Sequence, residues 1–401
     1  MANFLGWIPH IVVFVGLAAS GLFYLASQFA FRRFFDREPP PPELPDDELP
    51  GITILKPLKG PDPCLYANLE SLCLQSYPRF QILCGVADAG DPAIEVVRQL
   101  QRAYPRADID LVIDPTVFGT NYKVSNLHNM MRIAKHEVIA LADSDIRVRA
   151  GHLRGLAAHL RDPRVGAVTC LYRAVSPGGL AAMTECLFIN SDFCTNVLVA
   201  RLIETLRYAF GATIALRRSV LDEIGGFLPL ASYLADDYQI GNRVAARGYR
   251  IALSKDLVDT MIGESRWRDL IRHQVRWART YRICRPAGYF ATVLVHGTLW
   301  SALVVLLNGF SPLACAAAGG VLALRYASMF VLYRRYLDMN AGIAELLWLP
   351  VKDLFSTLVW LSAFTGDTVW WSGRRFRVER NGEMTDLTPP PPQVEDLSVR
   401  A

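Results

Sequence analysis

The chain has 401 residues, of which 52% are hydrophobic and 20% are charged, and its formal net charge is +4. This length allows one or two domains with a sizeable core, and the apolar content is high for a soluble enzyme but low for a chain lying wholly in lipid. The small net charge gives no basis for nucleic acid as a partner, so we expect a membrane protein with a water-exposed domain.

The N-terminal 31 residues contain no Asp, Glu, Lys or Arg. They are long enough to cross about 30 Å of hydrocarbon, and they lack the basic start and the A-x-A site of a cleaved signal peptide. Arginines at 32, 33 and 37 follow directly, which by the positive-inside rule places the chain after them in the cytoplasm. Residues 32–50 are basic and then proline-rich, typical of an extended linker.

Residues 51–285 alternate short apolar runs with helical patterns. Strands are predicted at 52–55, 82–86, 111–113 and 138–142, with helices such as 93–104 and 124–135 between them. This alternation predicts an α/β domain with a parallel sheet and crossover helices. Ligands bind such sheets beyond the carboxyl ends of the strands, where Asp88 and Asp143 fall.

Apolar character returns in residues 289–370, predicted to be a second membrane region of two or three helices. Segments 291–307 and 313–332 are suited to crossing a bilayer. Segment 346–364 contains Lys352 and Asp353 and either spans or lies in the interface, and the aromatic and arginine residues after it favour the interface. We expect residues 371–401 to form a cytoplasmic tail with a disordered end.

The eight cysteines form no C-x-x-C pair, and no histidine spacing indicates zinc. Several lie in apolar segments, so we expect reduced, buried thiols of a cytoplasmic domain.

Asp143-Ser144-Asp145 follows the apolar run at 138–142. Residues i and i+2 of an extended segment share a face, so both carboxylates can approach one Mg²⁺ or Mn²⁺, which relieves their mutual repulsion. A solvated turn is the alternative interpretation of this short motif.

Three other charged residues precede this motif. Asp88 ends a predicted strand, where its carboxylate can accept from a base or ribose. Asp91 precedes Pro92, which is equally well explained by a helix N-cap. Lys123 lies at a helix start, where a cation opposes the helix dipole unless a bound anion such as diphosphate compensates; a surface lysine is the alternative.

Two later motifs are also charged. Asp236 and Asp237 enter an amphipathic helix, a common place for acids even without a function. His273, Arg276 and Trp277 lie within one or two helical turns, and a guanidinium beside an indole suits a diphosphate and a ring-shaped ligand. A membrane-surface helix with an interfacial Trp explains the same three residues.

The order of these motifs resembles membrane-bound, GT-A fold glycosyltransferases of the family 2-like type. The similarity is greatest to the ceramide glucosyltransferase family and to the related hopanoid-biosynthesis glycosyltransferases of bacteria. It covers about residues 51–280 and the membrane layout. The matching segments are ITILKPLKGPDP, NLESLCLQSYP, GDPAIEVV, KVSNL, ADSDIRV, GATIALRRSVLDEIGGF, LADDYQIG and HQVRW.

The resemblance implies roles for individual residues. Asp91 matches the first family aspartate, and Asp143 matches the second, with Asp145 completing the metal motif. Asp237 matches the catalytic base, and Asp236 stands where Glu is common. The other residues that we expect at the nucleotide sugar are Lys56, Asp88 and Lys123.

The Q/R-x-x-R-W motif of the family matches His273 through Trp277, with Arg276 at the position of its arginine. His273 departs from the usual Gln or Arg, and it retains the ability to donate to a phosphate. Arg276 is expected to support the leaving group, and Trp277 to line the acceptor path.

The resemblance therefore implies an inverting, Mg²⁺- or Mn²⁺-dependent transfer from a UDP-sugar to a lipid hydroxyl. The acceptor is ceramide or, alternatively, a hopanoid polyol such as bacteriohopanetetrol receiving N-acetylglucosamine. The amphipathic segment 178–206 is expected to form the lipid entrance, and the enzyme is expected to be a multi-pass protein of a bacterial inner membrane with its catalytic domain in the cytoplasm. A processive polysaccharide synthase would need more membrane helices, and a non-catalytic scaffold would not need every catalytic carboxylate.

Overall fold

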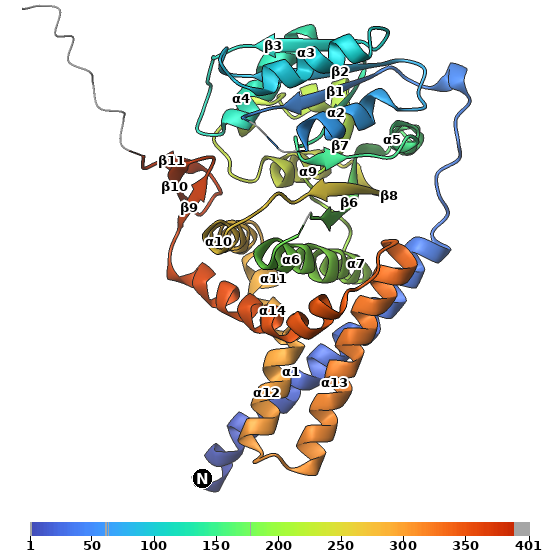
Figure 1. The fold of residues 1–401 in the computed structure, drawn as a ribbon. Helices are drawn as coiled ribbons and strands as arrows, with labels where there is room; N and C mark the ends of the chain where they lie inside the picture. The colour runs from blue at the N-terminus through green and yellow to red at the C-terminus, as the bar shows by residue number, and fades with distance from the viewer. Residues whose placement is uncertain (1, 61, 63, 177, 389–401) are drawn as a thin grey trace, which may run out of the picture.

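The computed structural model describes residues 2–60, 62, 64–176 and 178–388. Its main feature is a mixed sheet of eight strands in the order β3-β2-β1-β4-β7-β6-β8-β5 (Figure 1). The strands are β1 (Ile52–Pro57), β2 (Phe80–Val86), β3 (Ile109–Ile113), β4 (Val138–Leu141), β5 (Ile146–Arg147), β6 (Val165–Val175), β7 (Ile214–Arg217) and β8 (Arg250–Met261).

The first four strands are parallel to one another, as predicted, and each coincides with a predicted run to within two residues at either end. β7 then pairs antiparallel with β4 and with β6, so the sheet is mixed rather than purely parallel. Neighbouring residues of β1 face opposite sides: Ile54 belongs to one buried cluster and Leu55 to the other. Burial on both faces explains why these strands are continuously apolar.

Helices cover both faces of this sheet. They are α2 (Leu65–Cys73), α3 (Ala93–Ala103), α4 (Tyr122–Met130), α5 (His152–Leu160), α8 (Arg218–Glu223) and α9 (Asp236–Ala246). The predicted helix at 124–135 is shorter than expected, because α4 gives way at Met131–Ile133 to a 3₁₀ turn.

Three apolar helices form a bundle that projects from the α/β unit (Figure 1). They are α1 (Ala2–Phe31), α12 (Gly297–Leu307) and α13 (Pro312–Val331). α12 follows α11 (Pro286–Ala291) and a short 3₁₀ turn after a bend of 52°. Within the described residues, four helices are long and apolar enough to cross a membrane, or five if this bent pair is one span.

Two further apolar segments lie across the inner end of the bundle, between it and the sheet (Figure 1). One is α14 (Ile343–Ser362). The other is α6 (Leu180–Leu187) and α7 (Cys194–Ile203), joined by a π-helical turn at Phe188–Phe193. α14 is also one of the four candidate spans by length and composition, so its interfacial position stays a prediction.

The C-terminal segment contains structure that we did not predict. After α10 (Trp267–Cys284) and the membrane helices, strands β9 (Thr368–Trp371), β10 (Arg374–Val378) and β11 (Met384–Asp386) form a separate antiparallel sheet. It packs on Leu234, beside α9. The expected disordered end, residues 389–401, lies outside the described residues.

All eight cysteines are free thiols, but the expected burial holds for only half of them. Four of them are buried, and Cys315 is exposed.

Candidate active site

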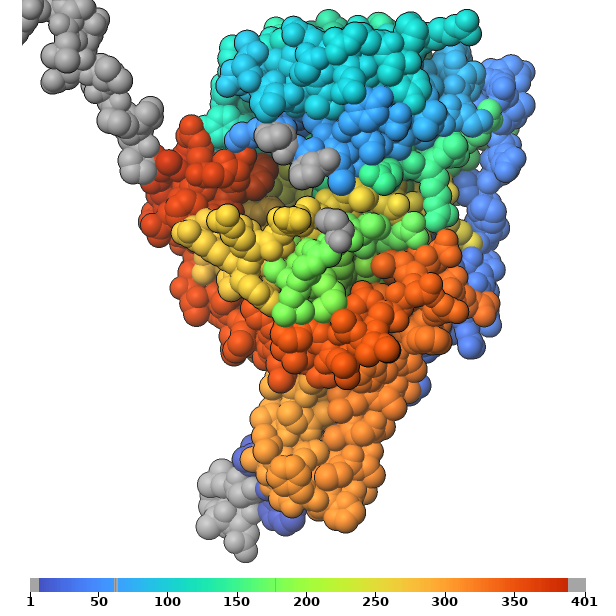
Figure 2. Space-filling view, viewed as in Figure 1, coloured from blue at the N-terminus to red at the C-terminus, as the bar shows by residue number. Residues whose placement is uncertain are grey.

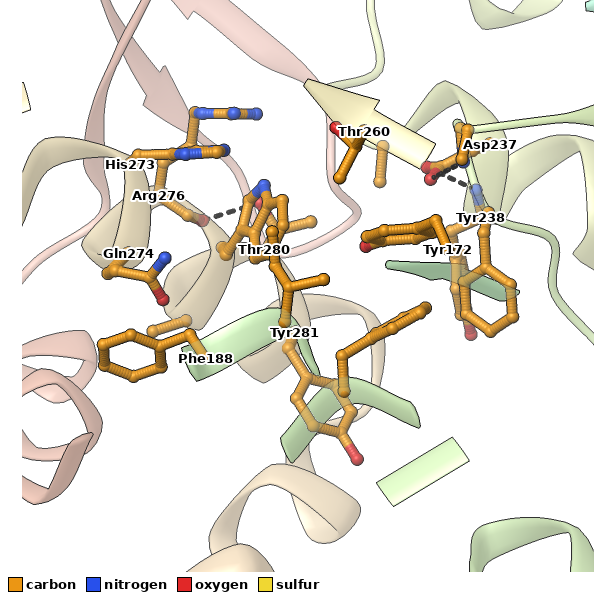
Figure 3. A pocket seen from close by; sticks show the side chains of 18 of the residues that line it. Tyr172, Phe188, Asp237, Tyr238, Thr260, His273, Gln274, Arg276, Thr280 and Tyr281 are labelled. Carbon is orange, nitrogen blue, oxygen red and sulfur yellow. Dashed lines mark hydrogen bonds between the residues drawn. The ribbon is translucent and has the colours of Figure 1, made fainter. Parts of the chain in front are cut away.

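A cavity of about 1010 Å³ lies at the carboxyl ends of β1, β2 and β4. Figure 2 shows a recess between the blue and cyan N-terminal half of the α/β unit and the yellow segment that contains α10. Figure 3 shows part of its lining, with Asp237 and Arg276 brought there from α9 and α10. The cavity unites ten of the eleven predicted site residues: Asp88, Asp91, Lys123, Asp143, Asp145, Asp236, Asp237, His273, Arg276 and Trp277.

The D-x-D carboxylates follow β4 directly. The Asp143 side chain is 38% exposed, and its Oδ1 lies 2.7 Å from Nζ of Lys123. Asp145 Oδ2 accepts a hydrogen bond of 2.7 Å from the hydroxyl of Thr260 on β8. Burial, and then the neighbouring charge of Asp143, raise the pKa of Asp145 to about 6. A cation beside this pair would therefore be stabilised by charges that otherwise repel each other.

Lys123 is the second residue of α4, and its Nζ also lies 3.2 Å from Oδ2 of Asp236. Burial alone would lower the pKa of this ammonium, but the carboxylates of Asp143 and Asp236 raise it overall. A cation at a helix start is unfavourable because it opposes the helix dipole, and these two carboxylates compensate for that cost. Lys123 thus links the D-x-D motif to the start of α9.

Lys56 is the predicted site residue that does not line the cavity. It is fully buried in β1, and its Nζ donates to the backbone carbonyls of Asp143 (2.5 Å) and Ile146 (3.4 Å). Burial lowers the pKa of Lys56 to about 8. Lys56 therefore supports the loop of the D-x-D motif from the side facing away from the cavity. Its side chain does not contact a ligand in the cavity directly.

Asp88 and Asp91 lie at the end of β2 on the cavity wall. The exposed Asp88 accepts from the backbone N–H of Gly90 (2.8 Å) and has a carboxylate oxygen left for a ligand. Asp91 Oδ1 accepts from the N–H of Ala93, the first residue of α3 (2.9 Å), and both its oxygens accept from the N–H of Gly60. Asp91 therefore accepts from the first N–H of α3, as the capping interpretation expects, although the N-cap position is Pro92 and not Asp91. The same contacts tie the loop after β1 to α3.

Asp237 lies in the first turn of α9, where the sequence places it. Its Oδ2 accepts from the N–H of Gly211 (2.9 Å) and its Oδ1 from the N–H of Tyr238 (2.7 Å) (Figure 3). Burial, and then the charge of Asp236, raise its pKa to about 6. A carboxylate with a raised pKa that remains ionised at neutral pH suits a general base.

Arg276 faces the cavity from α10. Among the described residues, its guanidinium makes no hydrogen bond or ion pair, although burial lowers its pKa. A partly buried cation without a protein partner has its donors available for an anionic ligand. This is the clearest anion-binding group in the cavity.

His273 is held by a partner that the sequence did not reveal. Its Nδ1 is hydrogen-bonded to Oε1 of the buried Glu185 of α6, and its ring lies edge-on to Trp277 with centroids 4.5 Å apart. The sequence gives a sign that Glu185 needs a partner, because it is the one charged residue of α6 and an unpaired buried charge is costly, but it does not indicate which residue that partner is. The pair fixes the orientation of the imidazole and joins α10 to α6.

The donor chemistry fits a divalent cation at Asp143 and Asp145. Both supply carboxylate oxygens, the ligands that Mg²⁺ and Mn²⁺ prefer. Among the described residues there is no group of three or more His, Cys, Asp or Glu arranged for a metal. The protein thus offers two carboxylates, which is the arrangement expected where phosphate and water complete the coordination.

The cavity extends from these polar groups to the membrane bundle. Its far end is lined by Tyr24 of α1, His296 beside α12, and Val359 and Trp360 of α14. The wall between the two ends belongs to the π-helical turn and α7, so the segment predicted as a lipid entrance does line the cavity. One space therefore connects the carboxylates with the apolar helices.

The chain matches the family model described as glycosyl transferase family 21 over residues 13–384. Ceramide glucosyltransferase 1 of Caenorhabditis elegans is 30% identical over 211 residues, which are 52% of this chain and 45% of that protein. Ceramide glucosyltransferase 3 of the same organism is 25% identical over 351 residues, 84% of this chain and 75% of that protein. The match thus spans less than half of the first relative and three quarters of the second.

Among solved structures, a mannosyltransferase from Pyrobaculum calidifontis in complex with GDP-Man and Mn²⁺ superposes with a TM-score of 0.52. It is 18% identical, and the match covers 88% of this chain and 97% of that one. At this identity the likeness concerns the fold alone. The family model spans most of the chain, and the chain, which has the GT-A fold, therefore belongs to glycosyl transferase family 21.

Proposed function

We propose that this glycosyltransferase moves a hexose from a UDP-sugar to the hydroxyl of a membrane lipid with inversion, the reaction of UDP-glucose with ceramide being the best match. This proposal rests mainly on the observation that the cavity is continuous. One end holds carboxylates and the guanidinium of Arg276, which has no partner in the part of the chain that the structure describes, and the other end reaches α1 and α14. A donor with a diphosphate suits the first end, and an amphipathic acceptor suits the second.

The proposed chemistry is a single displacement. The Asp237 carboxylate takes the proton of the acceptor hydroxyl as that oxygen bonds to the anomeric carbon. The bond from the anomeric carbon to the diphosphate oxygen breaks, and UDP leaves with that electron pair. Arg276 binds the negative charge that develops on the leaving diphosphate. A divalent cation held by Asp143 and Asp145 would add to this charge neutralisation.

The surrounding residues position these groups. Gly211 N–H and Tyr238 N–H orient the Asp237 carboxylate, and Lys123 joins Asp143 to Asp236. Asp236 is therefore assigned a supporting role. The relatives named above are ceramide glucosyltransferases, which favours ceramide over a hopanoid polyol as the acceptor.

The membrane arrangement that fits this reaction has α1, α13 and the bent pair of α11 and α12 crossing the bilayer, with α14 and α6–α7 at its surface. The cavity then opens at the level of the lipid head groups. The arginines that follow α1 and those at the end of α13 favour a cytoplasmic catalytic domain.

The function is tested with the purified chain in lipid nanodiscs containing ceramide, supplied with UDP-glucose or, in parallel, UDP-N-acetylglucosamine. Mass spectrometry should detect a hexosylated lipid and release of UDP, and EDTA should abolish transfer until Mg²⁺ or Mn²⁺ is added. Release of UDP without any glycolipid would reject the lipid acceptor, and full activity after thorough chelation would reject the metal.

A further inference from the structure

The C-terminal sheet forms part of the wall of the active-site cavity. Trp371, Ser372, Arg374 and Phe376 line the cavity together with the carboxylates, although they follow the last membrane helix in the chain. The sheet is the red unit beside the cyan and yellow parts of the α/β domain in Figure 1. The glycosyltransferase sheet and the C-terminal segment therefore bound the same space.

The sheet is attached to the donor side of the cavity by specific contacts. The N–H of Met384 donates to the carbonyl of Ser232 (2.7 Å), and the hydroxyl of Thr120 donates to the carbonyl of Met384 (3.1 Å). At the turn between β9 and β10, Nζ of Lys59, in the loop after β1, donates to Oγ of Ser372 (2.8 Å). The turn between β9 and β10 thus reaches the loops at the ends of the parallel strands.

Arg374 is the charged group that this sheet presents to the cavity. Its guanidinium lies over the ring of Tyr122, 5.1 Å from the centroid, and its Nη1 is 2.8 Å from Oδ2 of Asp386. Tyr122 is the first residue of α4 and precedes Lys123, which binds the D-x-D motif. Among the described residues Nη1 alone is bonded, so the remaining guanidinium donors are available.

We propose that Arg374 binds the diphosphate of the sugar nucleotide, so that the C-terminal sheet completes the donor site. This inference rests on the proposed function, since it assumes a UDP-sugar donor. An arginine fixed at one end by a carboxylate and stacked on an aromatic ring is preorganised for a phosphate. Its position beside the start of α4 places it at the donor end and away from the membrane helices.

The test compares three variants of the full chain in nanodiscs: Arg374→Ala, Arg375→Ala and Asp386→Asn. Arg375 is the matched control, because successive residues of β10 face opposite sides and Arg375 does not line the cavity. Affinity for UDP is measured by calorimetry and for uridine by competition with UDP. Losing a charge-assisted hydrogen bond weakens binding about tenfold or more, so Arg374→Ala should lose that much affinity for UDP.

The same variant should bind uridine normally and should raise the KM for the UDP-sugar without changing the KM for the lipid. Arg375→Ala should bind UDP within about threefold of the parent, because it keeps the guanidinium of Arg374 and its contacts. Asp386→Asn should lose less UDP affinity than Arg374→Ala, because it removes one anchor of the guanidinium and keeps the guanidinium itself. The inference is overturned if Arg374→Ala binds UDP like the parent. It is also overturned if uridine and UDP affinities fall together, or if Asp386→Asn loses as much, since the sheet would then act only as a structural cover. Failure of the parent protein to bind UDP would instead reject the donor itself.

Discussion

Replacing Arg276 by Gln should lower transferase activity strongly while leaving the stability of the protein almost unchanged. The guanidinium faces the cavity without a protein partner among the described residues, and burial already lowers its pKa. Removing its charge therefore breaks no ion pair of the folded protein and relieves part of a desolvation cost. We expect the variant to be as stable as the parent to within about 1 kcal/mol.

The loss in function should be much larger. A hydrogen bond to a charged group contributes about 1.5–3 kcal/mol, which corresponds to a loss of roughly 10- to 150-fold. If Arg276 supports the leaving diphosphate, this loss appears in kcat as well as in UDP affinity, because the charge on the diphosphate grows as the glycosidic bond breaks.

The assay combines transfer kinetics, UDP calorimetry and thermal unfolding of the purified protein in one detergent. Arg268→Gln is the matched control, since Arg268 is an exposed arginine of the same helix. Unchanged kcat and UDP affinity in Arg276→Gln would refute the assignment. A large drop in thermal stability would show that Arg276 is structural.

Three further predictions concern pH, stability and topology. Because burial raises the pKa of Asp237 to about 6 and a base acts when deprotonated, kcat should fall as the pH drops through 6; a flat profile from about pH 7.5 to 5 would contradict this. Lys352→Met leaves the buried Asp353 and the partly exposed Asp192 with less compensation, so it should destabilise the protein by about 3–5 kcal/mol. Arg335→Gln breaks an exposed ion pair and should cost under about 1 kcal/mol, and equal shifts of the two variants in thermal unfolding would count against the network around Lys352. In a chain whose exposed Cys315 is first removed by Cys315→Ser, a cysteine introduced by Leu313→Cys at the outer end of the bundle should react with an impermeant thiol reagent in intact cells while Cys64 does not, and the reverse pattern would overturn the cytoplasmic orientation.

The sequence was informative where structure depends on local patterns. Continuous apolar runs mark strands buried on both faces, and the run at 138–142 therefore located β4 and placed Asp143 at its carboxyl end. Because the carboxyl ends of parallel strands meet at one sheet edge, the strand pattern was enough to predict that Asp88 and Asp143 lie at the same site. The contact of Asp91 with the start of α3 followed from the neighbouring Pro92 in the same local way, although the N-cap itself is Pro92.

The sequence was uninformative where contacts join distant segments. Lys56 lies near the D-x-D motif, yet only the packing of β1 beside β4 shows that it is buried beneath the loop. The pairing of His273 with Glu185 depends on α6 lying against α10. The C-terminal sheet was missed because its short strands, rich in Arg and Trp, match a membrane-interface pattern, and their apolar partner, Leu234, is remote in sequence.

The most direct test of the proposed reaction is a paired measurement on Asp237→Asn. The variant keeps the shape of the side chain but cannot accept a proton, and general base catalysis contributes about 10²–10⁴-fold. Transfer from UDP-glucose to ceramide should fall by that factor while UDP affinity stays near that of the parent, and Asp236→Asn should do less damage. Near-normal transfer by Asp237→Asn would contradict its role as the base, and loss of UDP binding would assign it to the nucleotide site instead.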